Sequence, residues 1–322
     1  MQNFIIFIVC ILTILSNSKY AVGQELFPNT EPASTMPKNV LGIRVFSESY
    51  KEVKQVRNMS ALRFMYGIRG DLTTYATLFF SNHHNWKMPE DFPFHNAPER
   101  GKVYPFKFDG AHVYLKYRFW NIDRQNTHFR AAAYLEGTYV NTTHHESEPD
   151  LFFGDNKGIG GGFIFTYLKN KFAISSTVGY IHPFDYVGVT PDPIIGLPDI
   201  PMRMQYGRTV AYSLSLGYLL LPRKYENYDQ GNLNLYLEFR GKAFGNSKVD
   251  LFYGTNREYY VINNRYPPAL KSGYFLDITP GIQYIYKSNL RIDFSASFRG
   301  IGFSYARLYP VFHVGIQRYF YL

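Results

Sequence analysis

The feature of the sequence that most constrains its fold is an alternation of apolar and polar side chains that recurs from Val40 to the last residue. In NLRIDFSASFRG (289–300), Leu290, Ile292 and Phe294 alternate with charged and small polar residues. A period of two residues places the two sets on opposite faces of a β-strand. No helical period of comparable length is present. Twelve alternating stretches predict an all-β chain, at about 40–50, 58–70, 72–82, 110–121, 128–141, 158–169, 171–182, 208–221, 232–244, 273–286, 289–303 and 307–322.

The connections between these stretches alternate in length. Five are short, at 70–72, 121–128, 168–171, 222–231 and 286–289, and four long ones lie between them, at 83–109, 142–157, 183–207 and 245–272. Only the first and last connections on the long-loop side, near 51–57 and 304–306, are brief. Outer-membrane barrels have short periplasmic turns and long extracellular loops. A soluble β-sandwich would share the alternation but not this asymmetry. We therefore predict an outer-membrane-type antiparallel up-and-down transmembrane β-barrel of about 12 strands over residues 40–322.

The N-terminus carries an export signal. The apolar run FIIFIVCILTILS (4–16) has the length of a signal-peptide core and is too short to cross a bilayer as a helix. Ala21-Val22-Gly23 provides a small-x-small cleavage site, so residues 1–23 are predicted to be a signal peptide and 24–39 a Pro-rich periplasmic lead. Cleavage removes Cys10, the only cysteine, which excludes disulfides and thiolate chemistry. The sequence does not decide whether the lead plugs the barrel.

Because lipid surrounds such a barrel, the apolar face of each strand points outward and the polar face lines the lumen. The predicted lumen is rich in basic residues and includes Lys116 and Lys242. Two interpretations follow: the charges form cross-lumen pairs that hold a closed barrel rigid, or the excess of arginine favours anions in a small wet pore. The predicted lumen charge set is Arg63, Arg118, Arg130, Glu136, Glu238, Arg240, Asp277, Arg291, Asp293 and Arg299.

Two long connections are rich in histidine. Imidazole and carboxylate groups suit zinc, copper or nickel, so a divalent metal site is one hypothesis for these loops. The spacing of these histidines does not place them on one face, whereas the HExxH spacing on a helix does. The alternative to a metal site is a solvated polar loop. No other cofactor is predicted. The candidate ligands are His83, His84, His95, His144 and His145.

Other functional classes find little support. The serine-hydrolase stretch of outer-membrane phospholipase is absent, and the Asp and His residues are too loosely placed for an omptin-type protease, so we predict no enzyme. The net charge of +9 would suit nucleic acid, but export argues against that partner. GIGGGF (158–163) opens a predicted strand rather than a helix, which disfavours a phosphate-binding loop and favours close packing near a barrel rim.

Several stretches resemble a family of Bacteroidetes outer-membrane β-barrel proteins labelled as transporters or hypothetical proteins. The most distinctive is GYLLLPRKYENYDQGNLNLYLEFRGK (217–242), with FPNTEPASTMP (27–37) and AISSTVGY (173–180) beside it. The resemblance implies an outer-membrane barrel. It assigns no functional residue to this chain. The terminal VFHVGIQRYFYL (311–322) is similar to the signature that barrel-assembly machinery recognises.

These observations predict a barrel in the bacterial outer membrane that contacts membrane lipid, and the assembly machinery during biogenesis. The favoured function is porin-like passive transport of a small polar solute, with an anion favoured by the arginine-rich lumen. The alternative is a binding or scaffold barrel whose histidine-rich loops capture a metal ion or a partner.

Overall fold

A computed structural model describes residues 27–51, 56–82, 105–141, 148–152, 154–190, 200–224, 230–253, 258–261, 271–302, 304 and 308–322. Twelve strands close into one barrel in the order β1-β16-β15-β14-β11-β10-β7-β6-β5-β4-β3-β2, every neighbouring pair antiparallel. The predicted twelve-stranded barrel is confirmed. Among the described residues, no helix is long and apolar enough to cross a membrane. The barrel strands are β1 (Val40–Lys51), β2 (Val56–Arg69), β3 (Leu72–Ser81), β4 (Lys107–Arg124), β5 (Thr127–Val140), β6 (Gly158–Lys169), β7 (Phe172–Pro183), β10 (Thr209–Leu221), β11 (Asn232–Phe244), β14 (Gly273–Tyr286), β15 (Leu290–Gly302) and β16 (Val311–Tyr321).

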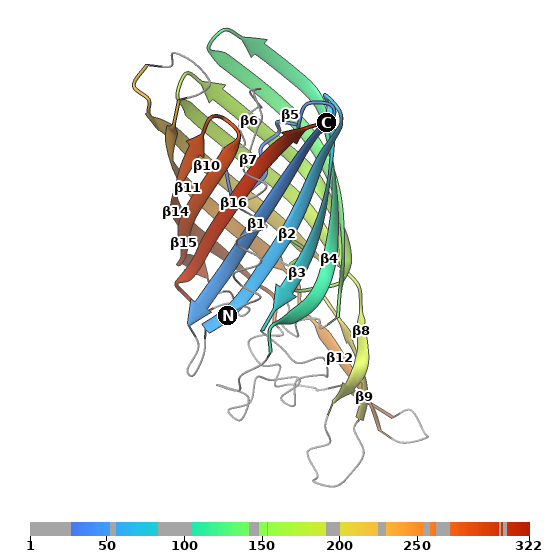
Figure 1. Cartoon of the computed structure of the whole chain (residues 1–322). Coiled ribbons are helices and arrows are strands. Elements are labelled where there is room, and N and C mark those ends of the chain that lie inside the picture. Colours follow the sequence, from blue (N-terminus) through green and yellow to red (C-terminus); the bar gives the residue numbers. More distant parts are fainter. Residues whose placement is uncertain are drawn as a thin grey trace.

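Four short strands that the alternation did not reveal lie in two of the long connections. They are β8 (Tyr186–Thr190), β9 (Ile200–Gln205), β12 (Lys248–Tyr253) and β13 (Glu258–Val261), and they form a separate sheet in the order β13-β12-β9-β8. This sheet projects from the end of the barrel opposite the C-terminus (Figure 1). Strands of four to six residues are too short to show a convincing period, which is why the sequence did not reveal them.

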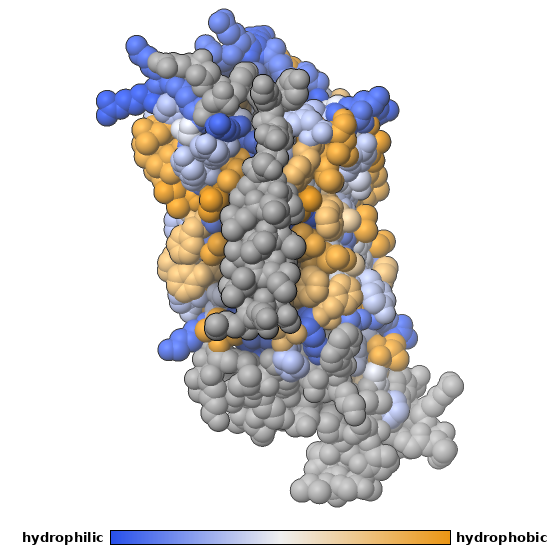
Figure 2. Space-filling model, in the orientation of Figure 1, coloured by the Kyte–Doolittle hydropathy of each residue, from blue (hydrophilic) through white to orange (hydrophobic). Residues whose placement is uncertain are grey.

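The outer wall of the barrel carries an apolar belt between two polar ends (Figure 2). On β15, Ile292 and Phe294 are 44% and 50% exposed, whereas Arg291 and Asp293 between them are 1% and 4% exposed. A soluble protein would not expose such a face, whereas a membrane-spanning barrel presents an apolar belt of this kind. The alternation therefore sorts lipid face from lumen as the sequence predicted.

The described part of the lead is residues 27–39: residues 27–36 lie inside the barrel, and residues 37–39 are exposed at its mouth. It enters at the short-turn end, where the Thr35 hydroxyl donates to the Gly70 carbonyl at 2.7 Å. Deeper in, the Ala33 amide donates to Thr166 Oγ1 on β6 at 2.8 Å, and Phe27 packs against Ala173 and Tyr236. The question that the sequence left open is thus answered for these residues, while the signal peptide, residues 1–23, lies outside the described residues.

A second segment enters from the long-loop end. This segment, named 148–156 for its described residues 148–152 and 154–156, lies between β5 and β6. Its Gly154 has a φ of 75°, a conformation that favours glycine. Leu151 is fully buried, and its carbonyl accepts a hydrogen bond from Thr138 at 3.1 Å. Phe152 packs against Phe46 of β1, with the ring centroids 6.4 Å apart. The lumen is therefore filled from both ends.

Candidate functional site in the barrel lumen

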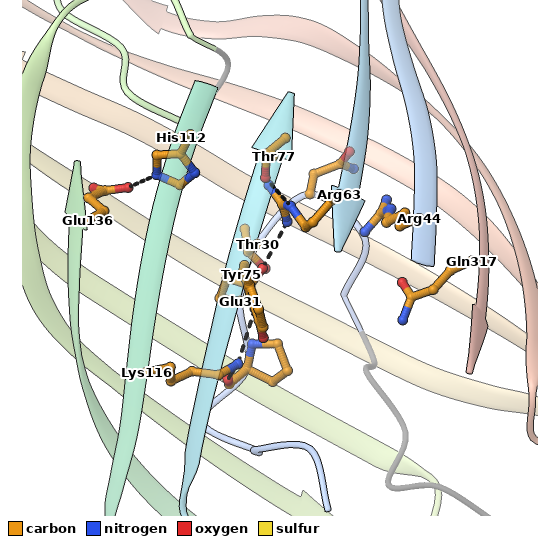
Figure 3. A network of polar contacts seen from close by, with 12 residues as sticks. Thr30, Glu31, Arg44, Arg63, Tyr75, Thr77, His112, Lys116, Glu136 and Gln317 are labelled. Atoms are coloured by element: carbon orange, nitrogen blue, oxygen red, sulfur yellow. Dashed lines mark hydrogen bonds and ion pairs between the residues drawn. The ribbon is translucent and has the colours of Figure 1, made fainter. Parts of the chain in front are cut away.

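Glu31 of the lead is the centre of a buried charge cluster. Its Oε1 lies 3.2 Å from Arg63 Nη1, and its Oε2 lies 3.1 Å from Lys116 Nζ (Figure 3). The Tyr75 hydroxyl donates to the same Oε2 at 3.0 Å. Arg63, Lys116 and Tyr75 are at most 2% exposed and come from β2, β4 and β3. One carboxylate thus joins the lead to three neighbouring strands.

The cations of this cluster are held in place by further contacts. Arg63 Nε donates to Thr77 Oγ1 at 3.0 Å, and Lys116 Nζ donates to the Pro32 carbonyl at 2.9 Å. The Arg63 guanidinium lies over the Phe152 ring at 4.6 Å and over the Phe46 ring at 5.0 Å. The two inserted segments therefore meet at Arg63, which contacts Glu31 of one and Phe152 of the other.

A second anchor of the lead is Glu238, a fully buried carboxylate in the middle of β11. It accepts hydrogen bonds from Asn29 Nδ2 at 2.6 Å and from Thr30 Oγ1 at 2.9 Å. Thr30 Oγ1 also lies 2.8 Å from Ser215 Oγ on β10. Here the wall supplies the negative charge and the lead supplies the hydrogen-bond donors. Polar contacts therefore hold the lead to β10 and β11 as well as to β2, β3 and β4.

Other charge pairs cross the inner wall. Arg44 lies 3.3 Å from Asp293, joining β1 to β15. His112 Nε2 lies 3.0 Å from Glu136 Oε2, joining β4 to β5. Lys242 of β11 binds Asp150 of the inserted segment 148–156. Each of these pairs places a buried charge in contact with an opposite charge on a nearby element, and the predicted pairing across the lumen stays a prediction.

Lys38 of the lead is exposed at the mouth, and every other charged residue that the structure describes in the two inserted segments is acidic. Residues 27–37 carry Glu31, and residues 148–156 carry Glu148, Asp150 and Asp155. Glu31 and Asp150 pair with lysines and an arginine of the wall, whereas Glu148 accepts from Ser304 Oγ at 2.9 Å. The segments that fill the lumen thus place carboxylates beside the basic side chains of the wall.

A cavity of about 160 Å³ lies between the two segments, where it is bordered by Glu31 and Phe152. Stacked tyrosines line one side: Tyr114 lies 5.3 Å from Tyr75 and 5.0 Å from Tyr134, at interplanar angles of 14° and 17°. The volume suffices for several water molecules or one small organic solute.

One sector of the wall has small inward residues that create this space. Thr177 of β7 and Ala211 and Ser213 of β10 border the cavity. Next to them, the stretch GIGGGF begins β6, and a Cβ at Gly162 would lie 2.2 Å from the Val178 carbonyl and 3.0 Å from Tyr134. The glycine-rich stretch serves close packing, as the sequence suggested, and leaves room for the tyrosines of β5.

The predicted lumen residues do not form a single ring. Arg63, Glu136, Glu238, Arg240, Asp277, Arg291 and Asp293 lie along the interior, whereas Arg118 and Arg130 lie at the short-turn end and Arg299 is exposed at the long-loop end. Arg130 Nη1 donates to Ser34 Oγ of the lead at 3.0 Å, and Arg118 Nη2 donates to the Gly70 carbonyl at 3.0 Å. The arginines are thus distributed between the two mouths and the interior.

The sequence missed the residues that the inserted segments contribute. Glu31, Asn29 and Asp150 had no alternating pattern around them that would place them in the lumen. Arg44 could have been found, because it is in phase with inward residues of β1 such as Phe46 and Glu48. Tyr309, in the last connection, donates to Asp277 at 2.5 Å; burial, and then the Asp277 carboxylate, raise the pKa of Tyr309, which keeps its proton.

The predicted metal ligands His83, His84, His95, His144 and His145 lie outside the described residues. Within the described part of the chain, no group of three histidine, cysteine, aspartate or glutamate side chains is arranged to hold a metal ion. Metal capture by these loops therefore stays a prediction.

Comparisons with known proteins support the barrel. The structure is similar to the COG4313 outer membrane channel from Pseudomonas putida F1, with a TM-score of 0.55, 10% identity, and coverage of 92% of this chain and 100% of that one. A weaker likeness links it to the toluene transporter TodX of Pseudomonas putida, with a TM-score of 0.35, 12% identity and 88% coverage of each chain. No protein-family model and no curated sequence matches the chain. The fold is thus that of an outer-membrane β-barrel, and the family resemblance suggested by the sequence has no further support.

Proposed function

We propose that this protein is a passive channel of the bacterial outer membrane for small polar solutes, that it favours anions, and that the lead closes it in the present conformation. The observation that carries the proposal is the lead itself, whose residues 27–36 occupy the lumen through polar contacts with the wall. A transmembrane barrel filled by a segment from its own N-terminal side has the layout of a gated conduit.

The polar character of these contacts supports reversible closure. A hydrogen bond inside a protein contributes only about 0.5–1.5 kcal/mol net, because water replaces it when the groups separate. Thr30 and Ala33 bind hydroxyl groups of the wall through hydrogen bonds of this kind, and the bond from Asn29 to the Glu238 carboxylate contributes about 1.5–3 kcal/mol. Water that enters the lumen can therefore solvate both sides as the lead withdraws, which an apolar plug would not allow.

The preference for anions is supported by charge. Withdrawal of the lead removes the Glu31 carboxylate from both Arg63 and Lys116, which raises the local positive charge of the wall. Arg118 and Arg130 at one mouth and Arg299 at the other add to the attraction. Arginine and lysine rings select anions in other pores.

A reversible crosslink tests whether the lead gates the barrel. Thr30 Oγ1 and Ser215 Oγ are 2.8 Å apart, so the double variant Thr30→Cys/Ser215→Cys places two thiols within disulfide reach. We expect planar bilayers containing the oxidised variant to be silent, and reduction to restore the conductance of the wild type. The single variant Ser215→Cys is the control and should conduct equally under both conditions.

Two results would count against the proposal. A wild-type protein that is silent in bilayers under all voltages favours the rigid, closed barrel in which the charge pairs are structural. Equal conductance of the oxidised and reduced double variant, with the disulfide verified by mass spectrometry, shows that ions bypass the lead.

A further inference from the structure

The cluster that holds Glu31 has the composition of a ligand site. Arg63, Lys116 and Tyr75 belong to the barrel wall, whereas the carboxylate they bind belongs to the lead. We propose that these three residues bind the carboxylate of a transported solute, and that Glu31 occupies their site as a tethered substitute. This inference rests on the proposed function, because it names the solute class that the channel passes.

The geometry of the donors fits a carboxylate. Each oxygen of Glu31 has its own partners: Arg63 Nη1 at 3.2 Å for Oε1, and Lys116 Nζ at 3.1 Å with the Tyr75 hydroxyl at 3.0 Å for Oε2. Two positive groups and one neutral donor thus converge on two oxygen atoms. Hydrogen bonds that involve an ionised donor and an ionised acceptor are short and strong, which suits recognition of an anion.

The positions of the donors do not depend on Glu31 alone. Arg63 is fixed by Thr77 through Nε at 3.0 Å and lies over the rings of Phe46 and Phe152. Since planar guanidinium groups stack on aromatic rings, these contacts orient the guanidinium before any anion arrives. The Arg63 part of the site is therefore oriented by groups other than Glu31.

The adjoining cavity indicates what the rest of the solute is like. The cavity of about 160 Å³ borders Glu31, and its lining combines the apolar surfaces of Tyr114, Tyr134, Leu151 and Phe152 with the charged groups of Glu136, Glu148, Asp150, Asp277, Arg240 and Lys242. Aromatic and aliphatic side chains favour an apolar body, and the volume admits only a few non-hydrogen atoms beyond the carboxylate. The chemical class is thus a small organic monocarboxylate.

Exchange between Glu31 and such a solute needs little rearrangement. Asn29 and Thr30 remain bound to Glu238 while the side chain of Glu31 rotates out of the site. A ligand on a short tether competes at an effective concentration on the order of millimolar. Removal of the Glu31 carboxylate should therefore strengthen the binding of a free carboxylate, which a purely structural charge pair would not predict.

The test measures the binding of sodium propionate and of propionamide, its neutral counterpart, by calorimetry in detergent. We expect Glu31→Ala to bind propionate at least tenfold more tightly than the wild type, with propionamide weak in both. Adding Lys116→Met to Glu31→Ala should reduce propionate affinity at least tenfold. Heat-modifiable electrophoretic mobility verifies folding, and the isosteric Glu31→Gln replaces Glu31→Ala if the alanine variant does not fold.

The outcomes separate this inference from the proposed function. If Glu31→Ala binds propionate no better than propionamide, or no better than the wild type, the carboxylate site is refuted even if the channel conducts. If propionate binds as expected but the wild type and its variants are silent in bilayers, the site stands and transport is refuted. Preference for inorganic phosphate over propionate would also overturn the assignment of the monocarboxylate class.

Discussion

Replacing Glu31 with glutamine should release the lead, because it removes the charge that binds Arg63 and Lys116 while keeping the shape of the side chain. Both cations are at most 1% exposed, so the pair is buried. Breaking a buried ion pair by neutralising one partner costs about 3–5 kcal/mol, because the other charge stays behind without water. In the open state, water solvates Arg63 and Lys116, and that cost disappears.

The expected effect follows from the difference between the two states. A cost of about 3 kcal/mol confined to the closed state shifts the equilibrium toward the open state roughly 100-fold, since each 1.4 kcal/mol is a factor of ten. A lead that leaves the lumen ~0.1% of the time in the wild type would then leave it ~10% of the time in the variant. Single-channel recording in planar bilayers measures this quantity as open probability.

The matched control is Asp71→Asn. Asp71 pairs with Arg69 at 2.6 Å in the short turn after β2, where the two side chains are 36% and 62% exposed. The variant changes the net charge by the same amount as Glu31→Gln, yet exposed pairs contribute little. We expect wild-type open probability for Asp71→Asn. If Glu31→Gln also matches the wild type within about threefold, the buried pair does not hold the lead closed and the reasoning is refuted.

Two further predictions concern the fit of the lead and the lipid face. At Gly67 a Cβ would lie 1.9 Å from the Pro37 carbonyl oxygen, whereas at Gly70 a Cβ would meet nothing within 4 Å. Gly67→Ala should therefore raise the open probability, and Gly70→Ala should leave it unchanged. Equal open probabilities for the two variants would argue against close packing of the lead on β2. On the outer face of β11, Leu237 lies near the middle of the strand and Leu233 near its short-turn end. An arginine at the bilayer midplane is costlier than one near the interface, so Leu237→Arg should lower the free energy of unfolding by about 2–4 kcal/mol and Leu233→Arg by only about 0–1 kcal/mol. Urea titration in lipid vesicles measures both, and equal losses would contradict the assigned depth.

The barrel could be predicted from the sequence because the pattern that specifies each strand lies within that strand. Each strand shows its own alternation, as in Leu290 to Phe298, and a one-residue shift would turn every apolar side chain into the lumen. The length of the connections then orders the strands without knowledge of any contact. This is why the twelve strands and the faces of Arg63, Glu238 and Asp293 agree with the structure.

The positions of the two inserted segments could not be predicted, because the residues they contact are far away in the sequence. Asn29 binds Glu238, 209 residues away, and Glu31 binds Lys116, 85 residues away. A Pro-rich segment has no period that would assign it to a face, so its polar residues appear equally suited to water. Only Glu31, an acidic residue shortly before a barrel with a basic lumen, gives a signal, and a single charge does not specify a partner.

The even number of strands explains why the N-terminal segment can serve as the plug. With twelve strands, β1 begins at the short-turn end where β16 finishes, and Val40 pairs with Tyr321. An extended chain spans at most about 3.3–3.6 Å per residue, so the twelve residues from 27 to 38 can reach roughly 40 Å from that end. This exceeds what is needed to bring Asn29 to Glu238 in the middle of β11. With an odd number of strands, the C-terminus would instead finish at the end opposite the start of β1. In this protein the start of β1 and the end of β16 share one mouth, and the close contact of Pro37 with Gly67 there fixes the point about which the lead would withdraw.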